Sequence, residues 1–369
     1  MKTLYLHIGF HKTGSSSIQQ SLLHLDQHDW KYISLNPKTG NDSGIIQSIF
    51  KKNPWNLRHH LRRGLTRAAS MQMASNLRQQ YRQQINESQA SNLLISAESF
   101  CSLNHDEIKQ AKKFFQGFGR RLVVVAYIRP VDAYLQSAFQ QNLKASPNPV
   151  ANYSDLPSSL KNTLPDYPRR IQDYISIFGR NNVRLFAFDP VSFPAKDSVV
   201  DFCLRLGIPA KYNSFVRVNE SLSLLAMKIL YFFSAVSYDE QLGQLKKTVK
   251  RPTLVSHLIA DFASQPSFKI CPKILQEVIS LHRQRYSELN ILVESYRDFS
   301  LVPPMLPENN SLQESNLVKS FMDLEVFTDA ERVSLIATCP NECQLGKSQK
   351  SDVDLVKSYL EKCSKTGKN

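Results

Sequence analysis

A short segment near the N-terminus combines glycines, a lysine and hydroxyl side chains at a spacing that can hold a phosphate. Gly9 and Gly14 bracket a loop that contains Lys12, and Ser15 opens a run of hydroxyl side chains. Glycines let a backbone approach an anion closely, and a helix that follows such a loop presents its positive N-terminal end. The segment therefore predicts an anion-binding loop between a strand and a helix.

The position of the lysine separates this loop from the nucleoside triphosphate loop G-x-x-x-x-G-K-[ST]. In that pattern the lysine after the second glycine reaches the terminal phosphates, and the next hydroxyl holds Mg²⁺. Here Ser15 follows Gly14, and the lysine lies inside the loop as Lys12. This difference weakens an ATPase, GTPase or kinase interpretation. A lysine within the loop instead suits a ligand with another anhydride bond than that of a nucleoside triphosphate.

An arginine and a serine form a second candidate anion site. Arg129 directly follows the apolar run 122–128, and Ser137 lies eight residues later in a predicted helix. Eight residues are about two helical turns, so one guanidinium and one hydroxyl could hold a phosphate together. The structural alternative is an ion pair between Arg129 and Asp132, with Ser137 as an ordinary helix residue.

Both features resemble the sulfotransferases that use 3′-phosphoadenosine 5′-phosphosulfate. Residues 12–16, Lys-Thr-Gly-Ser-Ser, are similar to the 5′-phosphosulfate loop of that family, and Arg129 and Ser137 match the pair that binds the 3′-phosphate. The residues around both features resemble bacterial-type carbohydrate sulfotransferases, chiefly in the first half of the chain. The resemblance implies a three-layer P-loop-like fold and metal-free sulfuryl transfer to a hydroxyl of a saccharide or glycolipid, with adenosine 3′,5′-bisphosphate as product.

The resemblance also implies a set of donor-binding residues. They are His11, Lys12, Thr13, Gly14, Ser15, Ser16, Arg129, Ser137 and Arg217. Arg217 belongs to a polar loop before a helix, where bacterial relatives carry a similar Asn-x-Ser-Leu segment. The alternative for that loop is a helix cap by Asn219.

Sulfuryl transfer needs a base for the acceptor hydroxyl and cations for the charge on the leaving phosphate. Lys12 is the expected cation. Glu98 is the first candidate base because it follows strand 93–97, which should neighbour the first strand, and some saccharide sulfotransferases place a catalytic glutamate similarly. A structural ion pair of Glu98 with Lys12 or Arg129 is the alternative. His11 is the second candidate base, whereas His7 lies within a strand and is expected in the core.

Strands and helices alternate along the first part of the chain. Predicted strands cover 4–8, 93–97, 122–128 and 183–188, and predicted helices follow them. This order gives right-handed crossovers and a central parallel sheet flanked by helices. The glycine loop, Glu98 and Arg129 would all lie at the carboxyl ends of strands, where ligands bind in such sheets.

We predict one α/β domain over residues 1–300 with a helical insertion near 45–90. A Pro-rich linker and a peripheral helical extension with a solvated tail follow over 301–369. The insertion contains a basic segment, 58–67, which is either a solvated helix face or a rim that meets an acidic acceptor.

The whole chain is basic, with 46 Lys and Arg against 32 Asp and Glu and a formal net charge of +14. This balance favours anionic ligands. Nucleic acid would also explain the charge, but zinc-finger spacings, RNP-type aromatic motifs and basic zippers are absent from the sequence. Two alternatives to a sulfotransferase remain. One is a nucleotide-dependent kinase of the P-loop class, and the other is a non-catalytic nucleotide- or polyanion-binding protein.

The N-terminus lacks a signal-peptide pattern, and no apolar run reaches the length of a membrane span. We therefore expect a cytoplasmic protein without a transmembrane segment. The six cysteines are scattered without a framework, which fits reduced thiols. Cys339 and Cys343 have the spacing of two metal ligands, but no second pair accompanies them, so no metal site is expected.

Overall fold

The computed structural model describes residues 2–27, 29–145, 155–209, 215, 221–235, 244, 247–294, 299–302, 317–339 and 351–366. They form two compact units. Unit 1 comprises Met1–Pro130, Asp166–Val218 and Arg283–Val302, and unit 2 comprises Val131–Pro165, Asn219–His282 and Pro303–Asn369. Each unit is assembled from three separate segments, whereas the division inferred from the sequence followed the order of the chain.

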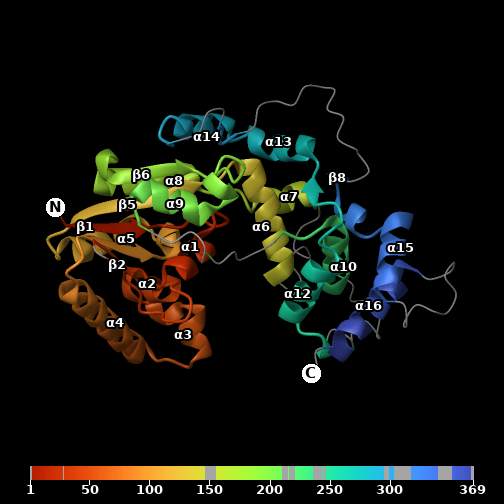
Figure 1. Ribbon diagram of the computed structural model, residues 1–369, viewed down its shortest axis with the longest axis horizontal. Helices are drawn as coiled ribbons and strands as arrows, with labels where there is room; N and C mark the ends of the chain where they lie inside the picture. The colour runs from red at the N-terminus through yellow and green to blue at the C-terminus, as the bar shows by residue number, and fades with distance from the viewer. Residues whose placement is uncertain are drawn as a thin grey trace. The chain divides into compact units, whose positions relative to one another are not determined.

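Unit 1 contains a six-stranded sheet in the order β2-β3-β4-β1-β5-β6 (Figure 1). The strands are β1 (Thr3–His7), β2 (Asp26–Gln27), β3 (Trp30–Tyr32), β4 (Asn92–Ser96), β5 (Arg121–Ile128) and β6 (Val183–Ala187). Only the β2–β3 pair is antiparallel. The predicted α/β class with a mostly parallel central sheet is confirmed, and the nearly continuous apolar runs of β4 and β5 are buried as expected for strands covered on both faces.

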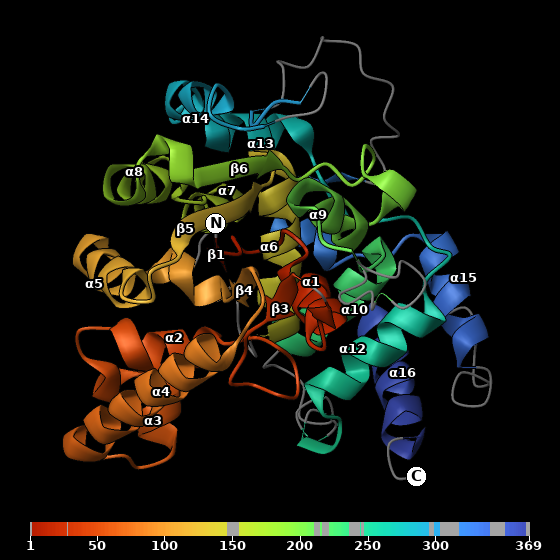
Figure 2. The same cartoon turned by 60° about the vertical axis from the view of Figure 1, so that its left-hand side comes forward.

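Two layers of helices cover this sheet. Helices α1 (Ser15–Leu22) and α9 (Ser198–Leu206) pack together and share an apolar cluster with Tyr5, Val125 and Tyr127 of the strands. Helices α5 (His105–Gln116) and α8 (Tyr167–Phe178) pack on β5 and lie on the other side of the sheet in Figure 2. The helix α14 (Arg283–Asn290) packs against α8. Helices thus cover both faces of the sheet, in which β1 lies between β4 and β5.

The segment expected as a helical insertion near 45–90 is divided into several helices. They are α2 (Ser43–Phe50), η1 (Pro54–Asn56), α3 (Arg58–Arg62) and α4 (Arg67–Glu87), and Figure 2 shows α4 beside α2 and α3. Thr66 caps α4 by accepting a hydrogen bond from the Ala69 amide. Tyr81 anchors the same helix, because its hydroxyl donates to the buried carboxylate of Asp42. The basic segment 58–67 lies on α3 and the start of α4.

Unit 2 is mainly helical. Its elements are α6 (Val131–Ala145), α7 (Leu156–Lys161), α10 (Leu224–Ala235), α12 (Arg251–Asp261), α13 (Pro272–Ser280), α15 (Asp329–Thr338) and α16 (Asp352–Thr366), with the short parallel pair β7 (Lys269–Ile270) and β8 (Leu317–Val318). The C-terminal helix α16, which was expected to be peripheral, buries one face. The ring centres of Tyr359 and Phe262 lie 5.4 Å apart, and Leu355, Val356 and Leu360 are fully buried. The end of the chain therefore helps to form the interior of unit 2.

Candidate functional site

The carboxyl ends of three neighbouring strands of unit 1 form the candidate site. β1 pairs in parallel with β4 on one side and with β5 on the other. The chain therefore changes its winding direction around β1, and ligands of open α/β sheets bind beside such a point. Gly9, Glu98 and Arg129 follow β1, β4 and β5 within two residues of each strand end.

The β1–α1 loop, residues 8–14, has a tightly fixed backbone. Lys12 and Gly14 adopt left-handed conformations with φ of 68° and 73°. The buried Thr13 hydroxyl donates to the Phe10 carbonyl at 2.5 Å, so this hydroxyl stabilises the loop from within. Gly14 precedes α1 without supplying a side-chain cap, and the positive N-terminal end of such a helix favours an anion.

Gly9 and Ser15 lie in close contact at the base of this loop. A Cβ atom on Gly9 would lie 2.2 Å from the Ser15 hydroxyl oxygen and 3.4 Å from Cγ of Glu98, so a larger residue cannot be placed there without a shift. The Ser15 hydroxyl is buried and has no hydrogen-bond partner in the described part of the chain. An unpartnered buried hydroxyl beside the start of a helix fits a ligand that carries hydrogen-bond acceptors.

Glu98 forms an ion pair with His11 of the β1–α1 loop. Glu98 begins the short helix η2 (Glu98–Ser102), and its Oε2 lies 3.3 Å from Nδ1 of His11. The other ring nitrogen of His11, Nε2, lies 4.0 Å from Sγ of Cys101. Contacts with the Cys101 thiol and the Glu98 carboxylate raise the pKa of His11 to about 10. His11 is therefore an imidazolium at neutral pH and adds a positive charge beside Lys12.

Arg129 binds the backbone of the loop. Its Nη1 donates to the Lys12 carbonyl at 2.9 Å, and its guanidinium lies 5.5 Å from the centre of the Phe188 ring. Because a left-handed lysine is conformationally costly, this hydrogen bond helps to hold Lys12 in place. Ser137 lies on α6 in unit 2, so its pairing with Arg129 stays a prediction. Arg217 lies outside the described residues.

A buried polar network beneath the loop was not predicted from the sequence. Nδ1 of His7 lies 2.7 Å from the Ser96 hydroxyl, which also accepts a hydrogen bond from Nε2 of Gln19 at 3.1 Å. Burial lowers the pKa of His7 to about 3, so the ring is neutral. His7 was expected in the core, but its Nε2 has no partner within the described residues. These three side chains connect β1, β4 and α1 below the candidate site.

Two other contacts at the site were also missed. Cys101 lies one short helical turn after Glu98, and no sequence pattern marks its approach to His11. Ser198 begins α9, far along the chain, yet its hydroxyl would lie 2.6 Å from a Cβ atom on Gly14. The β1–α1 loop is thus enclosed by residues that only the folded sheet brings together.

No cluster of three or more His, Cys, Asp or Glu side chains suited to a metal ion occurs among the described residues. Within the same part of the chain, every helix is too short or too polar to cross a membrane. Comparisons with protein-family models, curated proteins and solved structures give no match to this chain.

Proposed function

We propose that the protein is a sulfotransferase that transfers a sulfuryl group from 3′-phosphoadenosine 5′-phosphosulfate to a hydroxyl of a saccharide or glycolipid. The observation that supports the proposal is the grouping of a cationic loop and a carboxylate at one end of the sheet. Glu98 lies against the loop that contains Lys12, and the lysine is inside that loop instead of following its second glycine. This arrangement combines a base with an anion-binding loop that lacks the nucleoside triphosphate pattern.

In this proposal the loop binds the phosphosulfate end of the donor. The donor supplies a sulfuryl group attached to a phosphate that can leave. Lys12 and the protonated His11 provide positive charge where negative charge gathers as the phosphate leaves, and the first amides of α1 and the Ser15 hydroxyl offer hydrogen bonds. These groups are held in place before the reaction, so they need little reorganisation during it.

Glu98 is the proposed base. The acceptor oxygen forms a bond to sulfur as the sulfur–phosphate oxygen bond breaks, and the hydroxyl proton passes to the Glu98 carboxylate. The contact with His11 at 3.3 Å fixes that carboxylate beside the loop. His11 is less suited to this role because an imidazolium has no lone pair with which to accept a proton.

Calorimetric titration with adenosine 3′,5′-bisphosphate, ADP and ATP, each with and without Mg²⁺, tests the donor site. We expect the bisphosphate to bind without metal and more tightly than ADP. Lys12→Met should weaken this binding about tenfold or more, because it removes a charge-assisted interaction. Lys38→Met is the matched control, since Lys38 is exposed in a turn of the same unit.

A turnover assay with a panel of saccharide acceptors tests the base. Glu98→Gln keeps the shape of the side chain, so it should retain bisphosphate binding while losing at least about a hundredfold in rate. A clear preference for ATP with Mg²⁺ would instead support a kinase and would end the sulfotransferase proposal. Near-normal turnover in Glu98→Gln would exclude Glu98 as the base.

A further inference from the structure

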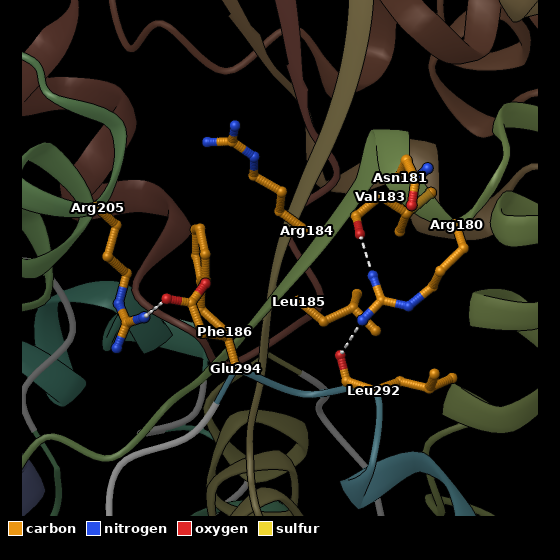
Figure 3. A pocket seen from close by; sticks show the side chains of 9 residues that line it. All are labelled: Arg180, Asn181, Val183, Arg184, Leu185, Phe186, Arg205, Leu292 and Glu294. Carbon is orange, nitrogen blue, oxygen red and sulfur yellow. Dashed lines mark hydrogen bonds and ion pairs between the residues drawn. The ribbon is translucent and has the colours of Figure 1, made fainter.

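A cavity of about 270 Å³ lies at β6, the edge strand of the unit 1 sheet, and its lining residues, shown in Figure 3, include none of the carboxyl-end site. Residues of η3 (Arg180–Asn182), β6, α9 and the segment 292–294 line it. One water molecule needs only about 10 to 15 Å³ of such volume, so the cavity has room for a molecule the size of a sugar.

The cavity exists because the sheet is incompletely extended at this edge. Glu294 continues the ladder beyond β6: its amide donates to the Leu185 carbonyl at 2.6 Å, and its carbonyl accepts from the Ala187 amide at 2.9 Å. Further along, Arg180 takes the place of the ladder by donating to the carbonyls of Val183 at 2.9 Å and Leu292 at 3.1 Å. Two backbone segments bridged by a guanidinium lie farther apart than two segments joined by a direct N–H···O=C hydrogen bond. Arg180 therefore keeps the segment 292–294 apart from the start of β6.

Arginines from three elements surround this space, and two of them already have partners. Arg180 bonds the two carbonyls, and Arg205 bonds Asp201 at 2.7 Å and lies 3.4 Å from Glu294. The side chain of Arg184, in contrast, forms no hydrogen bond or ion pair with any residue that the structure describes, although its backbone belongs to the sheet. It is half-buried in β6, where strand alternation places it on the same face as Phe186, over which Arg205 lies at 4.8 Å.

We propose that this cavity binds a sugar-sized polyol that carries one oxyanion, such as a sulfate, phosphate or carboxylate group. The three lining arginines outweigh the carboxylates of Glu294 and of Asp201, which pairs with Arg205, so the cavity favours an anion. The guanidinium of Arg184 is the group that an oxyanion would pair with. The Glu294 carboxylate, 66% exposed, and the Asn181 amide are placed to bind hydroxyl groups of the same ligand. This site is separate from the proposed donor site and does not depend on it.

The test is calorimetric titration of the full chain with glucose 6-sulfate, glucose 6-phosphate, glucuronate, glucose and inorganic phosphate. We expect the charged sugars to bind more tightly than glucose and than inorganic phosphate, and the ranking of the three identifies the oxyanion. Arg184→Gln should weaken this binding about tenfold or more, because it removes a charge-assisted hydrogen bond without breaking one of the fold. Arg62→Gln is the matched control, since Arg62 is exposed on α3 of the same unit.

A Lys12→Met variant separates this site from the carboxyl-end site. Charged-sugar binding that persists in Lys12→Met and is lost in Arg184→Gln supports the cavity as the site, whatever the result with adenosine 3′,5′-bisphosphate. The proposal is overturned if none of the charged sugars binds, or if Arg184→Gln has no larger effect than Arg62→Gln. It is equally overturned if inorganic phosphate binds as tightly as the sugar esters, which would indicate an adventitious ion only.

Discussion

At the scale of single residues, the two histidines near the β1–α1 loop differ in charge because their surroundings differ. Contacts with Cys101 and Glu98 raise the pKa of His11 from 6.5 to about 10, whereas burial lowers the pKa of His7 to about 3. The two residues are only four positions apart in the sequence, and the strand position of His7 indicated its burial, whereas nothing in the sequence indicated the contact of His11 with Cys101. Each has a measurable consequence with its own sign.

For His11, the folded pKa lies above the unfolded value, so its stabilising contribution is complete below pH 6.5 and is lost as the pH rises toward 10. We expect the His11 ring signal in a proton–carbon NMR titration to keep the imidazolium position through neutral pH. In Glu98→Gln and in Cys101→Ala the midpoint should fall toward 6.5, because each change removes one of the two partners. A midpoint that is the same in all three proteins would contradict the ion-pair arrangement.

For His7, the folded pKa lies below the unfolded value, so its stabilising contribution is complete above pH 6.5 and is lost as the pH falls toward 3. Between these limits the unfolded chain binds one proton more at this position than the folded protein does. Each unit by which the pH falls therefore lowers the free energy of unfolding by about 1.4 kcal/mol. Urea unfolding of His7→Phe from pH 6 to 4 should show a slope smaller by about that amount. His24→Gln, at an exposed position, is the control, and equal slopes in His7→Phe and wild type would refute the prediction.

At the scale of elements, the join between the β1–α1 loop and α1 depends on a glycine for two separate reasons. Gly14 has a φ of 73°, and a Cβ atom there would lie 2.6 Å from the Ser198 hydroxyl of α9. Gly64 has a similar φ of 62° but open space around it. A comparison of substitutions at the two glycines therefore separates the cost of a left-handed backbone from the cost of a steric collision.

We expect Gly64→Ala to lower the free energy of unfolding by about 1 to 2 kcal/mol, the cost of a left-handed alanine. Gly14→Ala should cost more, because it adds the collision with Ser198. In a Ser198→Ala background, which removes the hydroxyl, part of that excess should disappear. Chemical unfolding of five proteins measures these differences: wild type, Gly64→Ala, Gly14→Ala, Ser198→Ala and the double variant. Equal costs at both glycines would show that Ser198 of α9 does not collide with a side chain at position 14.

The regular elements of unit 1 were predictable because each has a strong local pattern. The apolar run 122–128 forms β5, and α5 starts with a capping box of Asn104 and Glu107, which is a local sequence signal. Because β4 neighbours β1, the approach of Glu98 to the loop was also predictable. The contact of Cys101 with His11 was not, because it depends on the turn of η2 and not on strand order.

Several helices were misjudged where local pattern and packing disagree. Residues 272–290 form two helices, α13 and α14, and no glycine or proline marks the break between them, so the local sequence does not indicate it. The lysines of the C-terminal segment indicated a solvated tail, but Leu355, Val356, Tyr359 and Leu360 recur along one buried face of α16. The two units were not predictable either, since each joins segments that are distant in the sequence.

At the scale of the whole molecule, a buried ion pair between two helices of unit 2 bears on the stability of that unit. Lys228 of α10 donates to the Glu331 carboxylate of α15 at 2.7 Å and to the Val326 carbonyl at 2.8 Å, and both charged residues are less than 10% exposed. A buried charge that loses its partner is strongly destabilising, whereas replacing both partners by apolar residues often restores stability. This pair therefore offers a way to weaken one unit selectively.

We expect Lys228→Met to destabilise unit 2 by about 3 to 5 kcal/mol, because it leaves the Glu331 carboxylate and the Val326 carbonyl without their buried donor. Hydrogen exchange followed by mass spectrometry should show faster exchange in α10 and α15, with β1, β4 and β5 unchanged. The double variant Lys228→Met with Glu331→Leu should recover much of the protection, although Glu331 also accepts a hydrogen bond from the Thr328 amide at 2.8 Å. An equal increase in exchange across β1, β4 and β5 would mean that the two units unfold together, and the carboxyl-end site would then depend on the stability of both.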